Sequence, residues 1–106
     1  MTSIKEIEKL LSNHKQDIQG EFKVKEIGIF GSWVRGEQKK RSDIDILVDF
    51  DEIPSFLKFM ALEEFLSEIL GKRVDLVMKS ALKPVIGRRI SSGVNYVITE
   101  NILFGQ

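Results

Sequence analysis

The feature that most constrains the fold is a pair of apolar runs, separated by a polar connection, within residues 27–50. The first run ends at Gly31 and has the bulky residues of a buried strand, so we expect a strand over residues 24–30. The second run alternates, which places Ile44, Ile46, Val48 and Phe50 on one face and Asp43, Asp45, Leu47 and Asp49 on the other. This pattern predicts a strand with one buried face and one acidic face.

The acidic face and the Gly-Ser turn each suggest a kind of ligand. Asp43 and Asp45 stand two apart on a strand, with Cα atoms roughly 6.5–7 Å apart, and their hard oxygens suit divalent metal ions. Ser32 can cap a short helical turn whose backbone N–H groups would face an anion. A phosphate cradle followed by paired carboxylates points to chemistry on a nucleoside triphosphate.

These residues also carry a resemblance to a known family. Gly31-Ser32, ten intervening residues and Asp43-Ile44-Asp45 resemble the GS-x10-DxD signature of polymerase-β-type nucleotidyltransferases. The surrounding GSWVRGEQKKRSDIDILV is similar to the minimal nucleotidyltransferase (MNT) family, and the likeness covers about residues 24–98. The resemblance implies an α+β (α/β-like) palm-like fold, with a mixed sheet of about three to four strands packed against helices.

One helix is expected before this segment and another directly after it. A capping box at Ser3 precedes apolar residues at helical spacing, and one amphipathic helix is predicted that ends at Gly20. Its stripe consists of Ile4, Ile7, Leu11, His14 and Ile18. Ser55 would cap a second helix that runs to Leu70 and stops at Gly71. Its broad apolar face consists of Phe56, Phe59, Leu62, Phe65, Leu66 and Ile69.

A third strand is predicted over residues 73–78, with Asp75 on the face opposite to its apolar residues. Because a carboxylate within an apolar strand costs free energy unless it is paired or coordinated, we interpret Asp75 as a third metal ligand. An Asp at this place also matches the family's third acidic position. A last helix is expected from Lys83-Pro84 to Gly93, followed by a short strand or extended tail over residues 95–98.

The resemblance implies roles for six residues. Asp43 and Asp45 would hold two Mg²⁺ ions, and Asp75 would complete the ion that activates the acceptor hydroxyl. Gly31 and Ser32 would bind the β- and γ-phosphates of ATP, and Arg35 would neutralise phosphate charge. A solvent-facing or carboxylate-paired Arg35 is the alternative. The same choice between solvent and nucleotide stays open for Lys39, Lys40, Arg41, Arg88 and Arg89.

Length and composition exclude several classes. The 106 residues suffice for one domain, residues 1–106, with a catalytic core at about 24–98. Sixteen basic and sixteen acidic residues cancel, so no direct nucleic-acid binding is expected. There is no cysteine, hence no disulfide and no thiol nucleophile. No run approaches the roughly 18 apolar residues of a membrane span, and a cytoplasmic location is expected.

The resemblance also suggests an acceptor. The chain is similar to MNT antitoxins, whose partner is a small helical HEPN-type ribonuclease and whose activity is transfer of AMP from ATP to a tyrosine of that toxin. A protein adenylyltransferase acting as an antitoxin is therefore the leading hypothesis. A binding module that neutralises its partner by contact is the alternative. Transfer to a small molecule such as an aminoglycoside is weaker, because the chain has no residues to spare for an acceptor-binding domain.

Overall fold

In the computed structural model, residues 3–39, 43–81 and 93–99 are described. Within these residues, four strands form one mixed sheet in the order β3-β2-β1-β4. The strands are β1 (Val24–Phe30), β2 (Ile44–Phe50), β3 (Val74–Met78) and β4 (Asn95–Ile98). β1 is antiparallel to β2 and β4, whereas β2 is parallel to β3. The expected α+β fold with a mixed sheet is confirmed, and residues 95–98 form a strand.

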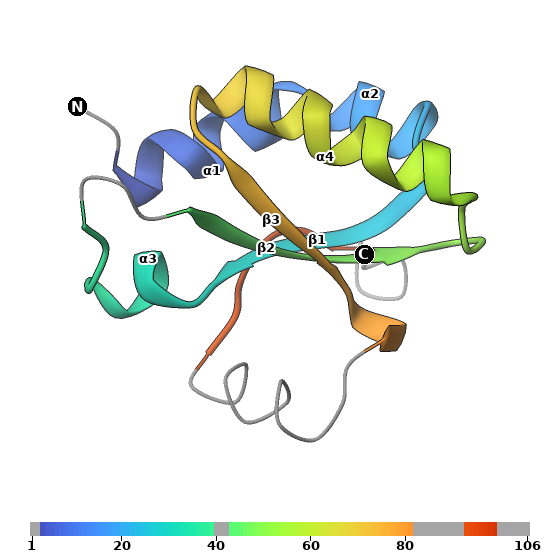
Figure 1. Cartoon of the computed structure of the whole chain (residues 1–106). Coiled ribbons are helices and arrows are strands. Elements are labelled where there is room, and N and C mark those ends of the chain that lie inside the picture. Colours follow the sequence, from blue (N-terminus) through green and yellow to red (C-terminus); the bar gives the residue numbers. More distant parts are fainter. Residues whose placement is uncertain (1–2, 40–42, 82–92, 100–106) are drawn as a thin grey trace, which may run out of the picture.

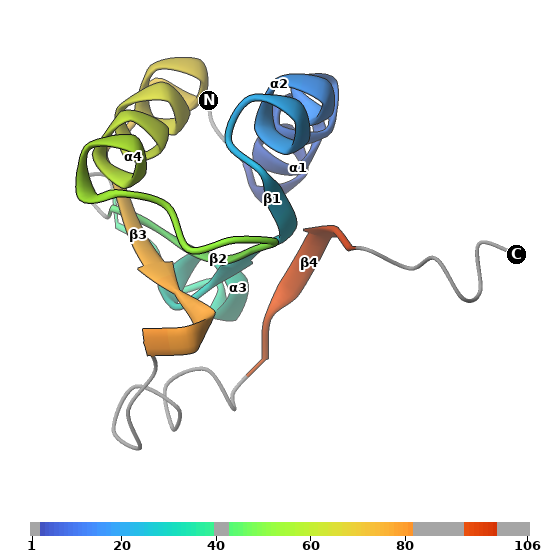
Figure 2. The same ribbon diagram turned by 90° about the vertical axis from the view of Figure 1, so that its right-hand side faces the viewer.

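Three helices cover one face of the sheet: α1 (Ile4–Asn13), α2 (Lys15–Gly20) and α4 (Phe56–Leu70). Figures 1 and 2 show these helices on the same side, with α4 over β3 and β2 and with α1 and α2 beside it. The short helix α3 (Ser32–Arg35) follows β1, and a 3-10 turn, η1 (Lys79–Ala81), follows β3. No helix in the described ranges is long and apolar enough to cross a membrane.

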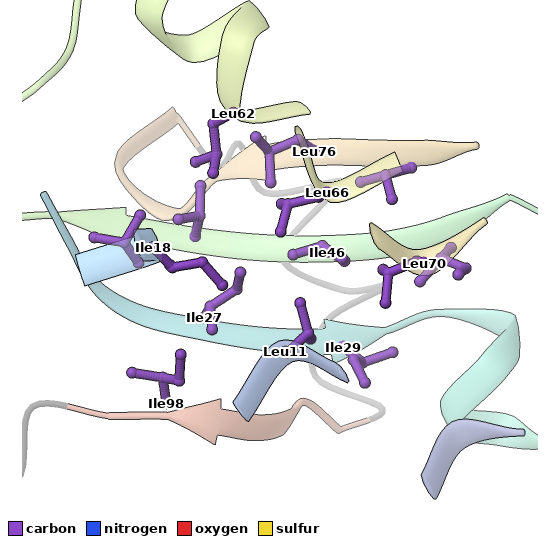
Figure 3. Packing of buried hydrophobic residues seen from close by; sticks show 14 of the residues in the cluster. Leu11, Ile18, Ile27, Ile29, Ile46, Leu62, Leu66, Leu70, Leu76 and Ile98 are labelled. Atoms are coloured by element: carbon purple, nitrogen blue, oxygen red, sulfur yellow. The ribbon is translucent and has the colours of Figure 1, made fainter. Parts of the chain in front are cut away.

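The core lies between the sheet and these helices (Figure 3). Ile46 of β2 and Ile27 of β1 are fully buried there, together with Leu66 of α4 and Leu11 of α1. The predicted alternation along β2 is confirmed, because Ile44, Ile46, Val48 and Phe50 all belong to this core. Burial of such side chains supplies most of the free energy that holds the helices on the sheet.

The predicted helix over residues 55–70 is confirmed in its bounds. Ser55 Oγ accepts a hydrogen bond from the Lys58 N–H at 3.2 Å, and Gly71 ends the helix with a φ of 68°. The apolar face is narrower than predicted, since Phe56 is 75% exposed. Phe56 stands six residues before the buried Leu62, which places it about 120° away round the helix.

The prediction of a single N-terminal helix, made from the apolar stripe, is wrong. The chain forms two helices, α1 and α2, which are separated at His14. His14 Nδ1 donates to the Leu10 carbonyl at 2.9 Å, while the His14 backbone N–H bonds to the Leu11 carbonyl at 3.2 Å. The imidazole thus takes the place of a backbone donor, and the α-helical ladder is interrupted. The ring is partly buried and meets Phe65 edge-on, with centroids 5.8 Å apart.

Several predictions fall outside the described residues. The helix expected from Lys83-Pro84, with Arg88 and Arg89, lies there, as do Lys40 and Arg41.

Candidate active site

Two of the three predicted metal ligands are neighbours on the face of the sheet opposite to the helices. Asp45 of β2 pairs with Asp75 of β3 in register, and Phe30 of β1 pairs with Asp45 on its other side. Paired residues on neighbouring strands have Cα atoms about 4.8 Å apart and point to the same face. The sheet therefore brings Asp45 and Asp75 together, although 29 residues separate them in the chain.

Asp43 comes directly before β2 and is exposed. The start of β2 is tied to the entry of β3, because the Ile44 N–H donates to the Arg73 carbonyl at 2.9 Å. Alternation along the strand gives Asp43 and Asp45 the same side of the sheet. All three predicted carboxylates thus lie at one end of the same face.

Asp75 is predicted as a ligand on the premise that its carboxylate lies buried within an apolar strand, and this premise is wrong. Its side chain is exposed, so the expected cost of burying a carboxylate within an apolar strand does not arise. Asp75 keeps its place in the site because of its register with Asp45 and not because of burial.

Gly31 lies against the carboxylate of Asp45. Its backbone has φ 78° and ψ −148°, a region that is essentially limited to glycine. A Cβ built on Gly31 would overlap Asp45 Oδ2 and would stand only 3.0 Å from its Cγ. The glycine thus serves two purposes, since it allows the turn after β1 and leaves room for the Asp45 side chain.

Ser32 is not the helix cap that the sequence predicts. It is the first residue of α3, and Gly31 is the N-cap, whose carbonyl accepts the N–H groups of Val34 and Arg35, both at 3.1 Å. The turn follows Gly31 because only this residue adopts the required backbone angles. The Ser32 side chain is half-buried, directly after Gly31.

Arg35 pairs with a carboxylate, which is the alternative to the phosphate-binding role that the resemblance implies. Its Nε donates to Glu37 Oε1 at 2.8 Å, and both side chains are exposed, at 38% and 64%. An exposed pair of this kind contributes little free energy, so a more strongly charged ligand could displace Glu37. Gly36 ends α3 in the left-handed region with φ 73°, as expected for a turn residue.

Trp33 is packed into the core, since only 4% of its surface is accessible. Among the described residues, its buried Nε1 has no hydrogen-bond partner. The Nζ of Lys72 lies 5.8 Å from the centre of its ring.

Within the described ranges, no three acidic or histidine side chains surround one point closely enough to hold a metal ion. The donor chemistry nevertheless fits a hard divalent cation, because Asp45 and Asp75 are adjacent carboxylates and Asp43 lies on the same side. The Asp45 carboxylate also occupies the space that a Cβ of Gly31 would fill, which sets it directly against the turn after β1.

A second group of side chains on this face, centred on Tyr96, is not predicted from the sequence. A bulge in the pairing of β1 with β4 sets Ile27 opposite Ile98 but Gly28 opposite Tyr96. A Cβ on Gly28 would come within 3.2 Å of the Tyr96 ring, so the ring lies over the bare glycine. The isolated Gly28 within the run of strand residues is the local signal that could have indicated a bulge or a close backbone approach here.

Lys79 lies over the same ring, with its Nζ 5.8 Å from the ring centre. It also donates to Glu26 Oε1 at 3.2 Å. This hydrogen bond is the main cause that raises the pKa of Lys79 above its ordinary value.

Comparison with known proteins places these observations in a family. The family described as "Nucleotidyltransferase domain" matches residues 11–98. The chain is 57% identical over 97 residues to the protein adenylyltransferase MntA of Thermococcus cleftensis, covering 92% of this chain and 98% of that protein.

Solved structures agree with this match. A crystal structure of a toxin–antitoxin with AMP-PNP is 26% identical and has a TM-score of 0.66, covering 88% of this chain and 70% of that one. A Shewanella oneidensis structure of a tri-AMPylated HEPN toxin in complex with an MNT antitoxin has a TM-score of 0.63 at 22% identity. It covers 87% of this chain and 72% of that chain, and at this identity it supports the fold alone.

Proposed function

Because the chain belongs to the nucleotidyltransferase domain family, we propose that it transfers AMP from ATP to a hydroxyl group of a partner protein. The partner we propose is a HEPN-type toxin, the modified group a tyrosine hydroxyl, and the role of the chain that of an antitoxin. The reaction would take place in the cytoplasm, without a membrane or a nucleic acid.

The observation that carries this proposal is the row formed by Asp45 and Asp75, with Gly31 against the Asp45 carboxylate. Two facing carboxylates beside a glycine turn fit a metal-bound triphosphate better than they fit a structural strand. The named activity of the Thermococcus relative supports a protein as the acceptor, because the similarity extends over almost the full length of that relative.

The carboxylates would hold the cations that the chemistry needs. Two Mg²⁺ ions, bound by Asp43, Asp45 and Asp75, would neutralise charge on the triphosphate and activate the acceptor hydroxyl. Asp43 and Asp45 would hold both ions, and Asp75 would complete the coordination of the ion that activates the acceptor hydroxyl.

The turn after β1 would bind the rest of the triphosphate. Gly31 lets the backbone approach the β- and γ-phosphates, and the Ser32 hydroxyl would donate a hydrogen bond to them. Arg35 would exchange its exposed pair with Glu37 for contact with phosphate, which carries more charge than one carboxylate.

The likeness in fold to toxin–antitoxin structures motivates the choice of partner. One of these complexes contains AMP-PNP, and another contains a HEPN toxin that carries three AMP groups. In the proposed reaction, the carboxylates of this chain would face a protein acceptor.

The test is the intact mass of the protein encoded by the neighbouring gene, after incubation with this chain, ATP and Mg²⁺. We expect a gain of one or more adenylyl groups that Asp43→Asn and Asp45→Asn abolish. Asp49→Asn is the matched control, since Asp49 shares the face but stands further along β2. A stable complex without any mass gain would favour neutralisation by contact and would refute AMP transfer.

A further inference from the structure

The outer surface of the helical layer carries an apolar patch that the fold does not use. The patch consists of four large side chains at the start of α4 and just before it: Ile53 (73% exposed), Phe56 (75%), Leu57 (80%) and Met60 (43%). Soluble proteins usually bury such residues when they stand together, and a contiguous exposed group of them marks an interaction site.

The patch lies on the side of α4 that faces away from the sheet. The sheet side consists of Leu62, Leu66 and Leu70, which are buried. Leu57 stands five residues before Leu62 and therefore about 140° away round the helix. Figures 1 and 2 show this outer side of α4 with no other described element over it.

The patch continues into an acidic half. Leu57, Met60 and Ala61 lie next to one another on the outer side of α4. The same outward row continues with Glu64, about one turn further, and with Glu68, about two turns further. All five residues are exposed. The outer side of α4 is thus apolar at its start and negatively charged towards its end.

We infer that this outer row of α4 is the docking surface for a helix of the protein acceptor. The inference rests on the proposed function, which requires a protein partner. A row at helical spacing is the shape that packs into the groove of another helix. Charge complementarity then specifies that helix, with apolar side chains opposite Leu57 and Met60 and basic side chains opposite Glu64 and Glu68.

A second copy of the chain fits this surface poorly. A two-fold axis parallel to α4 sets Glu64 against Glu64 of the other copy, which is unfavourable because like charges meet. A two-fold axis perpendicular to α4 runs the two helices in opposite directions, so that the row meets itself reversed. If the pair is centred on Ala61, Leu57 faces Glu64 or Glu68 of the other copy. If it is centred on Leu57, Glu64 approaches the exposed Asp51 and Glu52 of the other copy. Both arrangements are unfavourable.

The apolar half of the docking surface lies at the end of the sheet away from Asp45 and Asp75, and α4 covers the face opposite to these carboxylates. β2 runs seven residues from the Asp45 end to the turn that leads into α4, which is roughly 20 Å. A partner docked on α4 would therefore leave the triphosphate turn open. The surface should determine how tightly the acceptor binds, and it should not affect the transfer step itself.

The test is Leu57→Glu, with the neighbouring gene's protein as the probe. We expect the dissociation constant of the complex to rise at least about tenfold. The KM for that protein should rise to a similar extent, with kcat within about twofold of the wild type. Gln16→Glu adds the same charge on the exposed side of α2 and should change neither. Glu64→Gln with Glu68→Gln should weaken binding less, and mainly at low salt.

Foldedness and function are checked separately. Leu57 is exposed, so Leu57→Glu should keep the wild-type melting temperature. Asp45→Asn should bind the probe as the wild type does while losing transfer. If the wild type binds but transfers no AMP, the proposed function fails and the docking surface stands.

Four outcomes would overturn the inference. The first is an unchanged dissociation constant in Leu57→Glu, and the second is a wild-type chain that does not bind the probe. The third is a dimer in light scattering that Leu57→Glu converts to a monomer, which would assign the patch to a second copy. The fourth is faster hydrogen exchange over residues 53–60 after removal of residues 100–106, which would assign it to the chain's own end.

Discussion

On β2, Ile44, Ile46 and Val48 point into the core beneath the helices, whereas Asp45 and Asp49 point to the opposite face. Among the described residues, the buried set contains no polar or charged side chain, while the other face carries the candidate site. The comparison of these faces teaches that one strand can supply the core with every second residue and carry the carboxylates of the candidate site, Asp45 among them, on the residues between. Substitutions one position apart should therefore have separable effects.

The largest effect that we expect is on activity, from Asp45→Asn on the site face. AMP transfer should fall about a thousandfold, because metal ions contribute several kcal/mol to the stabilisation of such a transition state. The free energy of unfolding should change by less than about 1 kcal/mol, since Asp45 is not part of the core. Single-turnover kinetics and urea titration measure the two quantities. If Asp45→Asn lowered the free energy of unfolding by more than it raised the activation free energy of transfer, the two faces of β2 would not have separable roles.

On the helix face, Leu66→Ala should have the opposite profile. Leu66 is fully buried, so the cavity should lower the free energy of unfolding by about 2–5 kcal/mol. Transfer by the folded protein should stay at the wild-type rate when it is measured below the transition. Leu57→Ala is the control on the same helix, and its exposed position predicts a change within about 0.5 kcal/mol.

Gly31→Ala should affect both quantities, because Gly31 joins the strand to the site. We expect it to lose about 1–3 kcal/mol of stability through its backbone angles, and to lose transfer because the new Cβ displaces the Asp45 carboxylate. Gly36→Ala is the control, since Gly36 also has a positive φ but nothing lies within 4 Å of its Cβ position. Gly36→Ala should cost about 1 kcal/mol and keep transfer. Equal losses of transfer in both variants would show that the contact with Asp45 is unimportant.

The smallest effect should come from Lys79→Met, which removes a pair at the far end of the site face. The side chains of Lys79 and Glu26 are 44% and 25% exposed, so the variant should lose about 0.5 kcal/mol or less.

The pKa of Lys79 is raised in the folded protein. Its stabilisation is therefore fully present below the ordinary lysine pKa of about 10.4, and it disappears as the pH rises through the folded value. Urea titrations between about pH 6 and 9 should show a constant difference between wild type and variant. A difference that shrinks within this range would contradict the assignment.

Local patterns predicted much of the fold. The alternation on β2, the cap at Ser55 and the stop at Gly71 each depend on residues close in sequence, and each is confirmed. The errors arose where apolar spacing alone decided the prediction, because spacing registers neither a side chain's hydrogen bond to its own helix nor which side of a helix meets the sheet. His14 interrupts the first helix through its ring hydrogen bond, and Phe56 stays outside the core because α4 turns it away from the sheet.

The candidate site divides in the same way. By itself the sequence determined which residue types are present, since the Gly-Ser turn, the Asp43–Asp45 spacing and the alternation of β2 are local features of the chain. Only the tertiary structure decided that Asp75 pairs with Asp45, that Gly31 rather than Ser32 caps α3, and that a bulge turns Tyr96 to the site face. The reason is physical. Strand register and close approach depend on how distant segments pack, and neither is a property of the neighbouring residues alone.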